Sequence, residues 1–147
     1  MWICNLFKNV VFQTVISGAF VFIVGQLFME YILKPLRRYE ELRGEAAYFL
    51  TFYGNRYNTK DEISKKANTM EEARKLAAKL RAFSIEMPKL FFKRKRRQLD
   101  AASVYFIGLS NNVNDNPNFN AIHDNEDKIM KALKLNSKIP KRWRNET

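Results

Sequence analysis

The sequence is poor in the residues that most often build covalent or metal-bound sites. It holds one cysteine, Cys4, and one histidine, His123. A single cysteine excludes a disulfide within the chain, and one cysteine with one histidine does not supply the ligands of a structural zinc site. Five glycines and four prolines are few for the many turns of a β-rich fold. No repeat, phosphate-binding glycine loop, acid pair or nucleophile pattern is found, so the sequence predicts an all-α protein without metal, cofactor or enzyme activity.

Charge is absent from residues 9–29, which read NVVFQTVISGAFVFIVGQLFM. As an α-helix this stretch is about 31 Å long, close to the ~30 Å hydrocarbon thickness of a bilayer. A core helix of a small soluble protein keeps a polar face, and a signal peptide has a shorter apolar region before a small-residue cleavage site. Here bulky residues follow, and only Gln13, Thr14, Ser17 and Gln26 interrupt the apolar run. The pattern predicts a transmembrane helix over residues 9–33.

The charges that flank this helix are unequal. Lys8 and the terminal amine precede it, whereas Lys34, Arg37, Arg38 and Arg43 follow it. Cytoplasmic flanks of membrane helices carry the excess of Lys and Arg. We therefore expect a single-pass protein whose N-terminal segment, residues 1–8, lies outside the cytoplasm and whose remaining chain lies inside.

Helical spacing of apolar residues predicts four further helices in residues 34–135. Pro35 ends or kinks the membrane helix because it has no backbone N–H to donate. Pro88 and the asparagine-rich residues 111–120 separate the later helices. Four amphipathic helices predict a small antiparallel bundle, followed by a basic tail at residues 136–147. The positions expected in its core are Leu36, Tyr39, Leu42, Ala46, Phe49, Leu50, Tyr53, Met70, Ala73, Leu76, Ala77, Leu80, Phe83, Leu99, Ala102, Phe106, Leu109, Ile122, Ile129, Met130 and Leu133.

Two helix starts carry a capping signal. Thr69 and Glu72 have the spacing of a capping box, in which the two side chains serve backbone N–H groups reciprocally. Asn120 stands just before the last apolar pattern and can cap it. The second bundle helix is therefore predicted to begin at Thr69 and the last one after Asn120.

Positive charge dominates the chain after Pro35, and the whole protein has a formal net charge of +11. Such a balance suits an anionic neighbour, which can be lipid headgroups, RNA or an acidic protein. Phe91 and Phe92 precede the densest run of cations and can enter a lipid interface, stack on bases or close the bundle. The candidate polyanion-binding residues are Lys93, Arg94, Lys95, Arg96 and Arg97.

His123 is the only catalytic candidate in the sequence. Small helical RNases of the HEPN class have an Arg-x4-6-His motif near such a helix start, where the histidine performs acid–base chemistry and the arginine holds phosphate. In this chain Asn118 stands five residues before His123, and no arginine lies between Arg97 and His123. The motif is degenerate, so we expect no catalysis.

The membrane helix has a pattern of small residues. Gly18 and Gly25 are seven residues apart and share one face, and such residues let helix backbones approach closely in lipid. No continuous polar stripe runs along the helix, which disfavours a wide, open channel and leaves a narrow or gated pore. The face expected for oligomerisation or pore lining comprises Thr14, Gly18, Val21, Phe22 and Gly25.

The anchor, the strings YEELRGEAAYFLTFYGNRY and AASVYFIGLSNNV, and the short last helix together resemble a known family. The chain is similar over most of its length to the membrane accessory proteins encoded beside type VI-B CRISPR RNA-targeting nucleases. The resemblance implies one anchor, a divergent HEPN-like helical domain, and an antiviral effector that assembles in the bacterial inner membrane and permeabilises it. Implied partners are membrane lipids, further copies of the chain, and RNA or the RNA-guided nuclease.

Three functions stay open from the sequence. The first is an oligomeric membrane effector that forms a gated pore. The second is a membrane-tethered module that binds RNA or a protein without forming a pore, and the third is a tethered HEPN-like RNase. The small residues of the membrane helix favour self-association and so the first function. The basic run suits binding to a polyanion, which is the second function.

Overall fold

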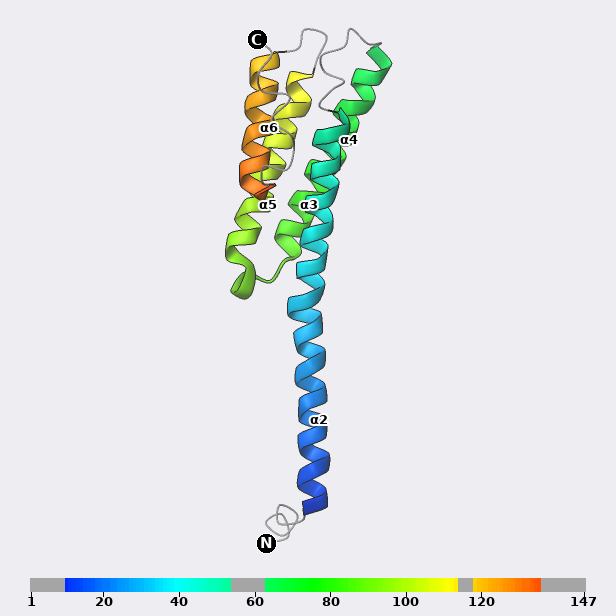
Figure 1. Ribbon diagram of the computed structural model, residues 1–147, viewed down its shortest axis with the longest axis vertical. Coiled ribbons are helices and arrows are strands. Elements are labelled where there is room, and N and C mark those ends of the chain that lie inside the picture. The colour runs from blue at the N-terminus through cyan, green and yellow to red at the C-terminus, as the bar shows by residue number, and fades with distance from the viewer. Residues whose placement is uncertain (1–9, 54–62, 114–117, 136–147) are drawn as a thin grey trace. The chain divides into compact units, whose positions relative to one another are not determined.

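A computed structural model describes residues 10–53, 63–113 and 118–135 of the chain, and these residues are almost all helical, without a strand. The predicted all-α class is confirmed. The predicted N-terminal segment 1–8 and basic tail 136–147 lie outside the described residues. The elements are α2 (Val10–Phe28), the π-helix η1 (Met29–Leu33), α3 (Lys34–Tyr53), α4 (Ile63–Glu86), α5 (Lys89–Asn112) and α6 (Phe119–Leu133), as Figure 1 shows.

Helix α2 is apolar on every side, and none of its residues is buried. By length and composition, one helix in the described part of the chain, near the N-terminus, is able to cross a membrane. The few hydroxyl groups of α2 bond to the helix itself: Thr14 Oγ1 donates to the Val10 carbonyl at 2.9 Å, and Ser17 Oγ donates to the Thr14 carbonyl at 3.1 Å. These two polar side chains therefore need no outside partner in an apolar environment.

Pro35 does not end the helix, because backbone bonding continues through η1 into α3. Lys34 N–H donates to the Met29 carbonyl five residues earlier, which is the π-helical pattern. The helical run then extends over Val10–Tyr53. Proline lacks an N–H and its ring crowds the preceding turn. The wider π turn just before Pro35 accommodates that ring, so the expected interruption is a local change in helix type.

The chain forms two compact units, residues 1–38 and 39–147. The second unit holds the predicted four-helix bundle, made of α3 from Tyr39 onward, α4, α5 and α6. Its successive helices alternate in direction, with α4 and α5 packed as a hairpin and α6 packed on α5 (Figure 1). Phe49 of α3 meets Phe106 of α5 edge to face, with ring centroids 5.5 Å apart. This aromatic contact ties α3 to the other helices of the bundle.

The core of the bundle follows the helical spacing closely. Every predicted core position is buried except four that are half-buried, namely Leu36, Tyr53, Met70 and Met130. Further residues complete the interior, and several are small or polar. The buried residues that the spacing did not predict are Thr69, Ser84, Met87, Phe92, Ser103, Ser110 and Val113.

Both predicted helix starts are wrong. Helix α4 begins at Ile63, well before Thr69, so Thr69 lies buried inside the helix, where a cap cannot form because an N-cap needs a non-helical backbone. The N-cap of α6 is Asn118, whose Oδ1 accepts a hydrogen bond from the Ala121 N–H at 3.2 Å. Asn120 is already helical. The sequence offers several possible capping residues before both α4 and α6. In each case the helix begins earlier than predicted.

Pro88 separates α4 from α5, as predicted, since α4 ends at Glu86 and Pro88 is the N-cap of α5. Helix α5 begins at Lys89 and therefore contains the whole basic run. Its backbone leaves helical geometry at Phe92, with φ −123° and ψ 24°. The first turn of α5 is thus kinked away from the rest of the helix.

Candidate functional site

The basic run occupies the part of α5 that follows the kink. Consecutive residues of an α-helix point about 100° apart, so five neighbouring cations cannot all face the same way. Lys93, Arg94 and Arg97 are exposed, whereas Lys95 and Arg96 are half-buried. The structure therefore divides the predicted polyanion-binding run into an outward set and an inward set.

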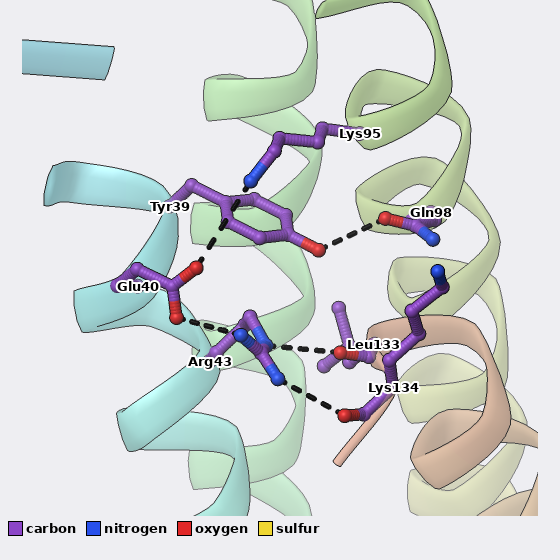
Figure 2. Close-up of polar contacts among 7 residues, drawn as sticks. All are labelled: Tyr39, Glu40, Arg43, Lys95, Gln98, Leu133 and Lys134. Carbon is purple, nitrogen blue, oxygen red and sulfur yellow. Dashed lines mark hydrogen bonds and ion pairs between the residues drawn. The ribbon is translucent and has the colours of Figure 1, made fainter. Parts of the chain in front are cut away.

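Lys95 belongs to the inward set and turns toward α3. Its Nζ lies 4.1 Å from the centroid of the Tyr39 ring and 4.0 Å from Glu40 Oε1 (Figure 2). A cation above an aromatic face is attracted by the electrons of the ring. Lys95 thereby links α5 to the start of the bundle.

Arg96 of α5 donates a hydrogen bond to a carbonyl group of α4 that has no donor within α4. Its Nε donates to the Ser84 carbonyl at 2.6 Å. In an α-helix that carbonyl would accept from residue 88, but Pro88 has no N–H. The Arg96 side chain supplies the missing donor and ties α5 to the end of α4.

The outward set lines an open hollow. Lys93, Arg94 and Arg97 surround a space of about 560 Å³ together with Gln98 and alanine side chains of α5 and α6. Within the residues that the structure describes, none of these three cations forms a salt bridge with a carboxylate. An uncompensated cluster of this kind attracts anions.

Two of these cations also border a second hollow on the side of α4. Lys93 and Arg97 lie there beside the ion pair between Arg81 and Asp100, around a space of about 290 Å³. The acid of that pair is already neutralised by Arg81. Positive charge therefore covers both sides of this part of α5.

Arg43 makes the most extensive polar contacts of the bundle, which Figure 2 shows. Its Nε donates to the Leu133 carbonyl at 2.9 Å, and its Nη2 donates to the Lys134 carbonyl at 3.0 Å. The last carbonyls of a helix have no partner within that helix. Glu40 Oε2 accepts a third bond from Arg43 Nη1 at 2.6 Å. One guanidinium thus closes α6 and joins it to α3.

Tyr39 lies beside this guanidinium and completes the contact between α3 and α5. Its hydroxyl donates to Gln98 Oε1 at 2.9 Å. Burial raises the pKa of the Tyr39 phenol above its ordinary value. The hydroxyl therefore keeps its proton and acts as a donor, and the group is structural rather than chemical.

His123 is exposed on the surface of α6. Its Nδ1 lies 3.1 Å from Glu126 Oε2. Burial raises the pKa of the Glu126 carboxyl, an effect that the His123 contact opposes. The partner of the histidine is therefore an acid, which repels phosphate when it is ionised.

The small-residue face of α2 is bare. Thr14, Gly18, Val21, Phe22 and Gly25 are all exposed. A Cβ atom added at Gly18 or Gly25 would meet nothing within 4 Å. Among the described residues of its own compact unit, therefore, nothing covers this face at the two glycines.

Metal ligands are not gathered anywhere in the described ranges, where no group of three His, Cys, Asp or Glu side chains could hold an ion. Comparison with protein families, with curated proteins and with solved structures gives no match. Function is therefore inferred from the physical features of α2 and α5.

Proposed function

We propose that the protein is a single-pass effector of the bacterial inner membrane that self-assembles through α2 and forms a gated pore. The observation that carries the proposal is the bare Gly18–Gly25 face on a helix that is apolar all round. Lipid offers no hydrophobic drive for helix association, so close packing at small residues has to supply it. The cations Lys34, Arg37 and Arg38 after the apolar segment favour a cytoplasmic bundle and an N-terminus outside.

The pore is narrow and closed at rest. A pore lined by α2 would present few polar groups, because the hydroxyls of Thr14 and Ser17 are bonded to the backbone of the helix. Apolar constrictions exclude water and ions until they widen. Opening therefore needs a signal. The resemblance to type VI-B accessory proteins suggests that this signal comes from antiviral defence by an RNA-guided nuclease, with the bundle as a HEPN-like receiver.

The test combines particle mass with membrane potential. Gly18→Leu with Gly25→Leu should leave membrane insertion intact, since leucine favours the bilayer, but should reduce the oligomer in detergent and abolish depolarisation of cells that overproduce the protein. Ile16→Leu with Ile23→Leu changes the opposite side of the helix and is the matched control. A monomeric parent, or a glycine double variant that assembles and depolarises like the parent, contradicts the proposal.

A second candidate is a tethered binding module without a pore, and the outward cations favour it. Lys93, Arg94 and Arg97 lie together without carboxylate partners in the described chain, as an RNA-binding surface would require. Salt-dependent RNA binding by a protein that does not depolarise cells would favour this candidate. The third, a tethered HEPN-like RNase, would need phosphate to bind beside His123, where the structure places Glu126.

A further inference from the structure

Large apolar side chains are exposed at the turn between α4 and α5. Ile85 is 65% exposed, Leu90 85% and Phe91 59%. Single exposed apolar residues are ordinary, but a group of them marks a surface that meets another apolar body. We refer to these three residues as the α4–α5 tip.

The tip is held in place by buried neighbours. Met87 and Phe92 are buried at 1% and 8% exposure, and they alternate along the chain with the exposed residues. Met87 N–H donates to the Phe83 carbonyl at 3.0 Å, and Phe92 N–H donates to the Pro88 carbonyl at 3.3 Å. The kink lies at Phe92, whose side chain is buried. Leu90 and Phe91 are therefore displayed outward by a fixed backbone.

Cations border the tip. Lys89, Lys93, Arg94 and Arg97 are exposed on the first turns of α5, against one exposed acid, Glu86. Apolar side chains flanked by Lys and Arg are typical of segments that enter the boundary between headgroups and acyl chains. The cations meet anionic headgroups there, while their aliphatic stems cover apolar surface. Both the cations and the exposed apolar side chains thus fit an anionic lipid surface.

We propose that the α4–α5 tip inserts into the anionic surface of the membrane that α2 crosses. The inference rests on the membrane insertion of α2 and not on pore formation. The bundle unit begins at Tyr39, six residues after the end of η1 at Leu33, so the segment of chain that joins it to the apolar helix is short. RNA would account for the cations and for stacking on Phe91, but phosphates and bases do not cover the aliphatic side chains of Ile85 and Leu90. Lipid accounts for both.

The experiment places a fluorescent probe at the tip of the full-length protein. Leu90→Cys is made together with Cys4→Ser, labelled with an environment-sensitive dye, and reconstituted into vesicles of phosphatidylcholine alone or mixed with phosphatidylglycerol. Ile107→Cys, at 48% exposure in the second half of α5, is the control site. In anionic vesicles the Leu90 probe should shift to the blue and be quenched by acyl-chain quenchers. The Ile107 probe should stay open to aqueous iodide.

Charge reversal tests the role of the cations. Lys93→Glu with Arg94→Glu should abolish the blue shift at Leu90 while α2 still resists alkaline extraction. A Leu90 probe as open to iodide as the Ile107 probe, or one that RNA protects and anionic vesicles do not, overturns the inference. If α2 still resists extraction in that case, the proposed membrane function stands. If the protein is extracted at alkaline pH, the proposed function fails, and the tip inference fails with it.

Discussion

Arg43 and Leu133 lie 90 residues apart in the chain and meet through a hydrogen bond of 2.9 Å between Nε and the carbonyl oxygen. The same guanidinium reaches the next carbonyl, that of Lys134, whose backbone is left-handed with φ 52°. The end of α6 has no glycine at this position, so the arginine contact contributes to holding the turn. One arginine of α3 thus holds the C-terminal end of α6.

Arg43→Ala should lower the free energy of unfolding by about 1–2 kcal/mol, because the half-buried Leu133 carbonyl and the exposed Lys134 carbonyl lose their donor. Arg43→Lys should restore little of this, since an ammonium cannot reproduce the planar fork that serves both carbonyls. Thermal unfolding of the detergent-solubilised protein, followed by circular dichroism, measures the change. Arg74→Ala, at an exposed position of α4, is the control. Equal stability of the Ala and Lys variants with the parent would contradict the role given to Arg43.

Glu126→Gln should stabilise the fold at neutral pH. Burial raises the pKa of this carboxyl in the folded protein above its ordinary value of 4.5. The group therefore favours folding below pH 4.5, and this contribution is lost as the pH rises through the folded-state value. The glutamine variant should have a higher Tm at pH 7, with a gain that shrinks toward pH 4. Glu86→Gln, at an exposed site, should show no such trend. A gain independent of pH would point to packing instead of ionisation.

The outward cations of α5 should contribute to binding, and the inward cations should contribute to stability. Lys93→Gln, Arg94→Gln and Arg97→Gln together should weaken binding to a polyanion and, for a nucleic acid, reduce the salt slope by roughly 2 to 3, with stability unchanged. Arg96→Gln should instead destabilise the protein by about 1–3 kcal/mol, because the Ser84 carbonyl loses its donor. Binding titrations and unfolding curves of the two variants decide the point. The assignment is wrong if the variants lose binding and stability in equal measure.

His123→Ala should change no catalytic activity. The histidine contacts Glu126, and an arginine at the spacing of the HEPN motif is missing from the sequence. The purified parent should leave single-stranded RNA intact, and so should the variant, as gel electrophoresis would show. RNA cleavage by the parent that the substitution abolishes would establish the nuclease.

Apolar periodicity was enough to predict most of the bundle core. Leu99, Ala102, Phe106 and Leu109 were expected on one face of a helix, and all four are fully buried. Burial of an amphipathic face is set by spacing within one helix, which the sequence displays directly. Helix ends depend on competing local signals, so Thr69 could not be distinguished from a true cap until the earlier start of α4 was known.

The polar contacts of the site join residues that are distant in the sequence, so no local sequence pattern predicts them. In the sequence Arg43 looks like one more cation after the apolar segment, because its acceptors lie at the end of α6. In the sequence, Arg96 cannot be distinguished from the other cations of the basic run. One signal was available there: Pro88 leaves the Ser84 carbonyl without a helical donor, which predicts that some side chain must supply one. Of the two neighbouring rings, Phe92 is buried and Phe91 is exposed, and the non-helical backbone at Phe92, which the sequence does not reveal, lies between them and the rest of α5.

The contact between Arg43 and Leu133 also has a consequence for how the protein is made. Translation at roughly 5–20 residues per second puts about 5 to 20 seconds between the synthesis of the two residues. Until α5 is complete at Asn112, Phe49 and Leu50 of α3 lack the helix that covers them, and α6 is complete only at the end of the interval. The apolar helix α2 is made before the bundle can close. A chain whose synthesis stops ahead of Leu133 therefore lacks the Arg43 contact and leaves apolar surface of the bundle available to chaperones and proteases.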